Sequence, residues 1–272
     1  MHFKNFLLCA LLLLAACWSG NAAAEKPLKI IAGTSLIEDI ARDLSGNTAE
    51  ILTLVQGSNC PGHENVKTSD FVFAAGADIL LLHAFQRDMP QVKTMLEAVK
   101  NKDLRVVFVP TRGSWLIPGN QKDASRHVAA ALAKAAPHEA AGFGARLQRR
   151  LARVDSLGTE CLAMLAPVRG KPVLAAAMQA EFLAWAGLDV LQTYGRTEDA
   201  SAGALAQVLQ AVRGKEVYGV IDNKQSGGDA GLTLALELKV PHLVLSNFPG
   251  SGQDVPDYFS LLHANVQALA CL

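Results

Sequence analysis

The stretch Leu28–Val55, LKIIAGTSLIEDIARDLSGNTAEILTLV, decides the fold of this chain. Its first residues, LKIIA, form a short apolar run with two isoleucines before a turn, which predicts a buried strand. The apolar residues of 36–46 then recur at helical spacing and Gly46 closes the run, which predicts a helix. AEILTLV at 49–55 predicts a second strand. This order of strand, helix and strand is typical of a parallel sheet.

The alternation of strands and helices continues along the chain, with one interruption. Strands are expected at 77–83 and 104–110, each preceded by a helix. Residues 123–166 carry no strand signal, and their leucines predict one helix before Pro137 and a long one from about Gly144 to Ala166. The alternation then resumes. Strands are expected at 171–177, 217–223 and 242–245, and a last helix at 256–272.

This pattern predicts the α/β class, with two (βα) lobes that each hold a parallel sheet and are joined by one long backbone helix. Open parallel sheets bind ligands outside the carboxyl ends of their strands, so we expect a ligand cleft between the lobes. We expect a signal or lipoprotein segment at 1–24 and an N-terminal lobe at 25–136. A linking backbone helix at 137–167 and a C-terminal lobe at 168–272 complete the division.

The N-terminus is typical of a targeting segment. One lysine precedes an apolar run from Phe6 to Ala16, which is too short to span a bilayer. The residues LAAC, ending at Cys17, resemble a bacterial lipobox, which predicts a membrane-anchored lipoprotein that begins at a lipidated Cys17. Ala22–Ala24 offers an alternative, the cleavage site of an ordinary signal peptide. Either cleavage predicts a mature protein that is periplasmic or at the cell surface.

Composition and charge restrict the class of protein. Half of the 272 residues are hydrophobic, which is enough to bury a sizeable core. The 25 basic and 25 acidic residues give no net charge, and no long run of like charge occurs, so nucleic acid is not expected as a partner. Beyond the targeting segment, Cys161 and Cys271 could pair and leave Cys60 as a free thiol. Alternatively, all three could be small buried side chains.

Polar or metal-competent side chains follow the expected strands in both lobes. Cys60 and His63 lie on the turn after the second strand. His83 ends the third strand, and Trp115 follows the fourth. We expect these side chains to meet others from the second lobe in the cleft, namely Met178, Gln179, Asp222, Asn223, Ser246 and Asn247.

Three segments carry a resemblance to a known family. The stretch 29–70 holds strand, helix and strand followed by CPGHENVKTSD, SWLIPGN stands at 114–120, and LAPVRGKPV follows the long helix at 165–173. They are similar to the Pro-His-x5-Ser-Asp segment, the Trp-Leu-Asp-Pro element and the helix exit of the zinc and manganese solute-binding proteins of bacterial ABC importers. The resemblance implies a monomeric binding protein, not an enzyme, that hands a metal ion to an ABC permease.

The resemblance carries over only one metal ligand, His63. The family's second histidine falls on Gly113, and its third ligand, a histidine or glutamate, falls among 176–179, where neither residue type stands. Its fourth ligand, an aspartate, falls on Ser246 or Asn247. The metal site has therefore been either lost or rebuilt.

We favour a rebuilt metal site, whose ligands would be Cys60, His63, His83 and Met178. Thiolate, imidazole and thioether suit zinc first, then copper, nickel or cobalt, whereas manganese prefers carboxylate oxygen. One alternative is a protein that binds a metal complex or an organic solute after loss of the metal site. The other is an enzyme with Cys60 as nucleophile and His63 as base, although no third orienting residue is apparent.

Overall fold

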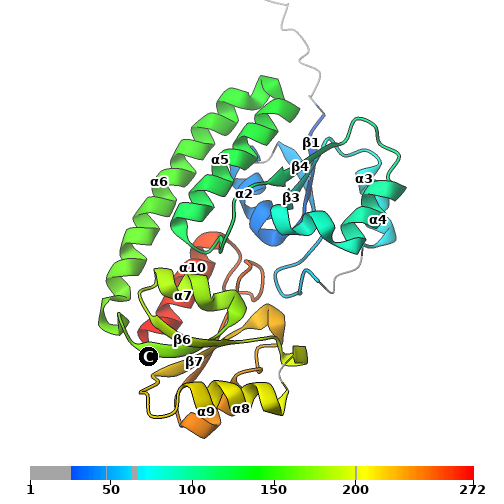
Figure 1. Cartoon of the computed structure of the whole chain (residues 1–272). Helices are drawn as coiled ribbons and strands as arrows, with labels where there is room; N and C mark the ends of the chain where they lie inside the picture. The colour runs from blue at the N-terminus through cyan, green and yellow to red at the C-terminus, as the bar shows by residue number, and fades with distance from the viewer. Residues whose placement is uncertain (1–25, 47, 63–65, 200) are drawn as a thin grey trace, which may run out of the picture.

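The computed structural model describes residues 26–46, 48–62, 66–199 and 201–272 (Figure 1). The targeting segment with Cys17, and the candidate ligand His63, lie outside the described residues. The described chain forms two α/β lobes joined by a long helix, as the sequence predicts. In the described part of the chain, no helix is both long and apolar enough to cross a bilayer.

Each lobe is built on a four-stranded sheet. The strands are β1 (Leu28–Ala32), β2 (Ala49–Thr53), β3 (Ile79–His83), β4 (Arg105–Val109), β5 (Pro172–Ala176), β6 (Asp189–Tyr194), β7 (Gly219–Asn223) and β8 (His242–Leu245). All neighbouring strands run parallel, in the orders β2-β1-β3-β4 and β6-β5-β7-β8, so the two lobes share one topology. Strand β3 is buried along its whole length, as expected where helices cover both faces of a parallel sheet.

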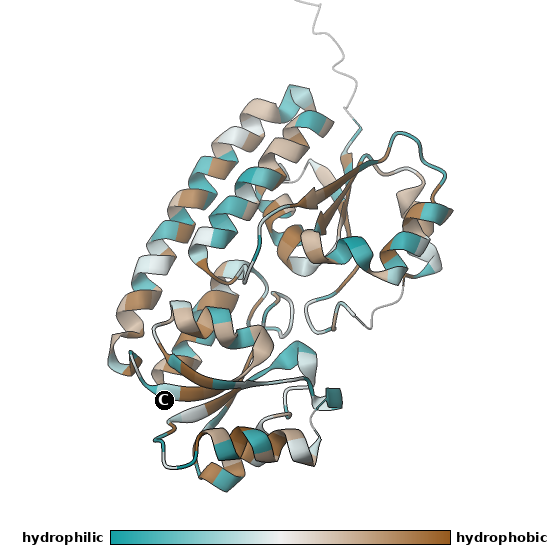
Figure 2. Ribbon diagram, in the orientation of Figure 1, coloured by the Kyte–Doolittle hydropathy of each residue, from teal (hydrophilic) through white to brown (hydrophobic). Residues whose placement is uncertain are grey.

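Helices connect the strands and cover the sheets. They are α2 (Ser35–Ser45), α3 (Thr68–Ala74), α4 (Pro90–Ala98), α5 (Pro118–Ala135), α6 (Ala140–Met164), α7 (Ala180–Trp185), α8 (Ala202–Ala211), α9 (Leu232–Leu238) and α10 (Tyr258–Ala270). Figure 2 shows the strands largely in the colours of hydrophobic residues, while hydrophilic and hydrophobic residues alternate along the helices. The core therefore lies between each sheet and its helices.

The long helix α6 runs along both lobes (Figure 1). It packs against α2 and α5 beside the first sheet and against α10 beside the second. It begins at Ala140, so Gly142 and Gly144 lie inside its first turns and do not break the helix. Phe143 is fully buried beside these glycines, and this packing outweighs their poor helix propensity.

A buried ion network fixes α6 to its neighbours. The guanidinium of Arg150 donates to Asp39 Oδ2 at 2.6 Å and to Asp43 Oδ2 at 2.8 Å, both on α2. It also lies over the ring of Phe259 on α10, at 5.3 Å from the ring centre. Burial raises the pKa of Asp39 above its ordinary value, while the charge of Arg150 acts in the opposite direction. One residue of α6 thus joins an element of each lobe.

Two expectations from the sequence need correction. Strand β6 is absent from the strands that the sequence predicts for the second lobe. Cys161 and Cys271 do not pair: both are free thiols, Cys161 buried on α6 and Cys271 exposed after α10. Burial raises the pKa of the Cys161 thiol to about 11, so this side chain is an inert part of the core.

Candidate functional site

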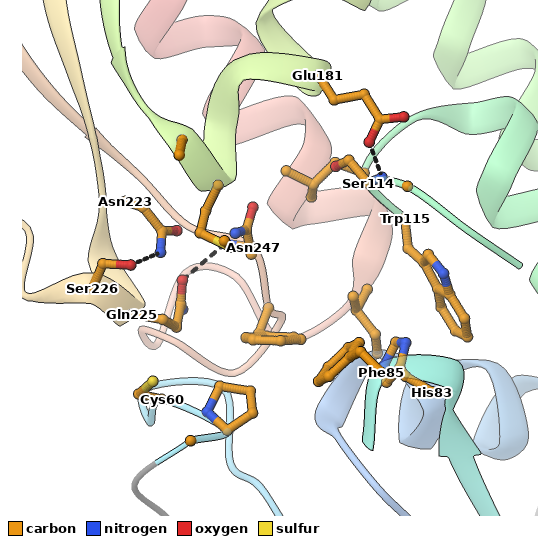
Figure 3. A pocket seen from close by; sticks show the side chains of 18 of the residues that line it. Cys60, His83, Phe85, Ser114, Trp115, Glu181, Asn223, Gln225, Ser226 and Asn247 are labelled. Carbon is orange, nitrogen blue, oxygen red and sulfur yellow. Dashed lines mark hydrogen bonds between the residues drawn. The ribbon is translucent and has the colours of Figure 1, made fainter. Parts of the chain in front are cut away.

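The strand ends of the two lobes meet at a cleft of about 610 Å³ (Figure 3). Its volume lies in the range of small-molecule sites. Most of the residues that border the cleft lie at the carboxyl end of a strand or in the loop after it. Open parallel sheets bind ligands at this edge. The bordering residues are 60–62, 83–85 and 111–116 from the first lobe, and 177–178, 181, 196, 223, 225–226 and 247–248 from the second.

His83 borders the cleft from the end of β3 but is only 4% exposed. Its Nε2 lies 2.7 Å from Thr34 Oγ1, and its ring packs 4.0 Å from the Trp115 ring and 5.0 Å from the Phe85 ring, between ring centres. Burial lowers the pKa of His83 to about 3, so the imidazole is neutral at ordinary pH. A neutral imidazole is competent to bind metal, although Nε2 is already engaged with Thr34.

Cys60 borders the cleft on the turn after β2 and is partly buried. The second lobe reaches it directly, because Arg196 Nη1 lies 3.8 Å from Cys60 Sγ. Arg196 follows β6, the strand that the sequence pattern did not reveal. A guanidinium from the opposite lobe therefore stands beside the thiol that we expected to bind a cation.

Two half-exposed apolar side chains border the cleft from opposite lobes. Phe85 is 53% exposed and follows β3, while Met178 is 51% exposed and follows β5. Trp115 also borders the cleft but is only 4% exposed, and its Nε1 donates to Thr111 O at 3.2 Å. Phe85 and Met178 thus offer apolar contact to a solute, whereas Trp115 forms part of the wall.

Amide side chains form the wall of the second lobe. Gln179 is fully buried, and its Nε2 donates to Asn223 Oδ1 and Asn247 Oδ1, both at 3.1 Å. Gln225 Oε1 accepts from the backbone N–H of Asn247 at 3.1 Å, and Asn223 donates to Ser226 at 2.7 Å (Figure 3). Gln179 supports the wall from behind, while Asn223 and Asn247 border the cleft itself.

Asp222 and Ser246 do not border the cleft. Successive side chains of a strand point to opposite faces, so Asn223 faces the solute side and Asp222 the other. Asp222 Oδ2 accepts from the backbone N–H of Gly231 at 2.9 Å and lies 2.7 Å from His242 Nε2. Ser246 is buried behind the wall, where its hydroxyl accepts from Gln225 at 2.8 Å.

Sequence reasoning missed Glu181, which borders the cleft from the first turn of α7. Its Oε2 accepts from the backbone N–H of Ser114 at 2.6 Å, so α7 of the second lobe is tied to the loop after β4 (Figure 3). Gly113 has a φ of 74°, and a Cβ there would lie 2.4 Å from Glu181 Oε1. A side chain at 113 would therefore have to displace the Glu181 carboxylate and adopt a strained backbone conformation. A polar residue in the first turn of a helix after a strand is the signal that could have found it.

The described residues also set a limit on metal binding by the protein alone. Across residues 26–46, 48–62, 66–199 and 201–272, no three His, Cys, Asp or Glu side chains gather into a group that could hold a metal ion. Cys60, His83 and Met178 all border the cleft, but only two of them are of these types.

Comparisons with known proteins agree with this architecture. Residues 30–271 match the ZnuA family, the periplasmic component A of a zinc-uptake complex. A crystal structure of ZnuA gives a TM-score of 0.77 at 18% identity, covering 90% of this chain and 98% of that one. The manganese-bound and cadmium-bound forms of a periplasmic metal binding protein from Candidatus Liberibacter asiaticus each give 0.76 at 14% identity, with coverage of 90% and 98%.

No curated protein matches the sequence. The solved structures share the two-lobed fold with this chain, and the family match extends over nearly all of its described residues. The chain belongs to the ZnuA family of periplasmic zinc-uptake components.

Proposed function

We propose that this chain is the solute-binding component of an ABC importer. It captures a transition metal in the cleft between its lobes, as a monomer, and delivers it to a membrane permease. Membership of a periplasmic zinc-uptake family supports this role. The lipobox at Cys17 adds a lipid anchor to the proposal, which would hold the protein near its permease.

The observation that carries the proposal is that Cys60, His83 and Met178 border one cleft, each from a different strand-end loop. His63 follows Cys60 by three residues and is the fourth proposed ligand, although it lies outside the described residues. A thiolate, imidazoles and a thioether favour zinc first, with copper, nickel and cobalt next and manganese least.

Elemental analysis of the purified protein tests the proposal. The parent chain should retain a transition metal, and Cys60→Ser and His63→Ala should each lower its affinity by at least the ~10–100-fold that is typical of losing a supporting contact. Cys271→Ser is the matched control, because this thiol is exposed after α10. Trp115→Phe should change the metal content little, since Trp115 forms wall. A parent chain that retains no transition metal contradicts the proposal.

A further inference from the structure

Two arginines give the cleft a positive character. Arg112 and Arg196 both border it, and neither has an ion-pair partner within the described chain. Glu181 is the one carboxylate among the described residues that border the cleft, and it already accepts from the backbone N–H of Ser114 at 2.6 Å. The bordering side chains thus offer two guanidinium groups against one engaged carboxylate.

This charge pattern opposes a bare cation. A metal ion bound to Cys60 Sγ would stand close to Arg196 Nη1, which lies 3.8 Å from that sulfur. Like charges at such distances repel, and the repulsion is strong where water is partly excluded. A carboxylate ligand on the metal turns this repulsion into attraction, because guanidinium groups bind carboxylates through paired, charge-assisted hydrogen bonds.

The size and lining of the cleft also fit more than an ion. About 610 Å³ is the volume of an organic-ligand site, and the exposed side chains of Phe85 and Met178 offer apolar contact. Asn247 borders the same space, and its Nδ2 donates no hydrogen bond within the described chain. The described residues supply too few ligands to complete a metal's coordination alone.

We propose that the cargo is a transition metal complexed by a small carboxylate-bearing chelator, with Arg112 and Arg196 binding its carboxylates. This inference rests on the proposed function, since it names the form in which the metal enters the same cleft. Asn247 donates to a further oxygen of the chelator, and Phe85 and Met178 contact its carbon atoms. The chelator supplies metal ligands beyond those that the described residues of the cleft offer.

Equilibrium dialysis against radioactive zinc, with and without labelled citrate, tests the inference. Citrate, a small tricarboxylate, should raise zinc affinity by roughly tenfold or more, the expected gain from charge-assisted hydrogen bonds. Zinc and citrate should be retained in equal amounts. If the site binds the bare ion, citrate should instead lower the retention of zinc, because citrate in solution then competes with the protein for the metal.

Variants at the arginines provide a second readout. Arg112→Gln and Arg196→Gln should each weaken retention of zinc citrate by roughly ten- to a hundredfold, as loss of a charged hydrogen-bond donor predicts. Arg196→Gln should leave retention of zinc alone unchanged or tighter, because a positive charge near Cys60 is removed. Arg213→Gln is the matched control, since Arg213 is exposed beyond α8 and outside the cleft.

The failures are distinguishable. If citrate lowers the retention of zinc, or if citrate is retained equally with and without zinc, the chelate inference is wrong. In the first case metal capture as such still stands. A chain that retains zinc in neither condition overturns both the inference and the proposed function.

Discussion

His83 links a single buried side chain to the pH dependence of folding. Its pKa is about 3 in the folded protein because of burial, against about 6.5 in an unfolded chain. As the pH falls from about 6.5 towards 3, only the unfolded state takes up this proton, so the folded state loses stability over that range. Above about pH 6.5 the contribution of His83 to stability is fully present. At pH 5 the loss from this residue is about 2 kcal/mol.

Urea unfolding of the metal-free protein at pH 7 and 5 measures this loss. His83→Gln should lose correspondingly less stability between the two pH values, because its side chain does not titrate. His127→Gln, at an exposed position on α5, should behave like the parent. An equal loss in the parent and in His83→Gln would refute the assignment.

Single residues of the site were predictable where strand ends decide their place. Cys60, His83 and Met178 all border the cleft. Their place could be predicted because hydropathy reveals where β2, β3 and β5 end and each residue lies at or after one of these strand ends. Arg196 could not be placed in the same way, because its contact with Cys60 joins residues 136 positions apart across two lobes. Nor does the sequence reveal whether Asp222 or its neighbour faces the solute, since the strand's orientation in the sheet decides it.

At the scale of elements, α6 depends on the charge of Arg150. Arg150→Ala should lower the free energy of unfolding by about 3–5 kcal/mol, because it leaves the carboxylate of Asp39, whose side chain is 10% exposed, without its partner. Chemical denaturation checks this value. Arg149→Ala is the control, since Arg149 is exposed one residue earlier on the same helix. If both variants lose the same small amount, the network does not stabilise α6.

The elements that the sequence revealed differ from those that it hid in how much they rely on partners. The strands at 28–32 and 79–83 are buried apolar runs that can be read alone. Strand β6 reads DVLQTY, lies at a sheet edge and has only its last residue buried, so its pairing with β5 defines it. Its register even shifts between Val173 and Leu174 of β5, which no periodic pattern anticipates.

At the scale of the whole molecule, close contacts hold the lobes together. Gln225 of the second lobe donates to Gly57 O of the first at 2.7 Å, and Ser35 donates to Pro249 O at 2.7 Å. A Cβ at Gly57 would lie 1.9 Å from Pro249 O, which a rigid backbone cannot accommodate. Gly57→Ala should therefore push the lobes apart and reduce the population that can bind solute.

Small-angle X-ray scattering should show a larger radius of gyration for Gly57→Ala. Its affinity for zinc should fall on the order of tenfold, if about a tenth of the molecules remain closed. Gly76→Ala is the control, because nothing lies within 4 Å of the position its Cβ would take. A variant with unchanged scattering and affinity would show that the lobes yield locally at Pro249.

The shared strand order of the two sheets gives each cleft loop a counterpart. The loop after β2 corresponds to the loop after β6, and these two carry Cys60 and Arg196, which touch across the cleft. Likewise β3 ends in His83 where β7 ends in Asn223. The two halves of the molecule thus share one strand order but carry different side chains at corresponding strand ends, a thiol and an imidazole in one half and a guanidinium and an amide in the other. A substitution at one strand end therefore changes one wall of the cleft and leaves its counterpart in the other half in place.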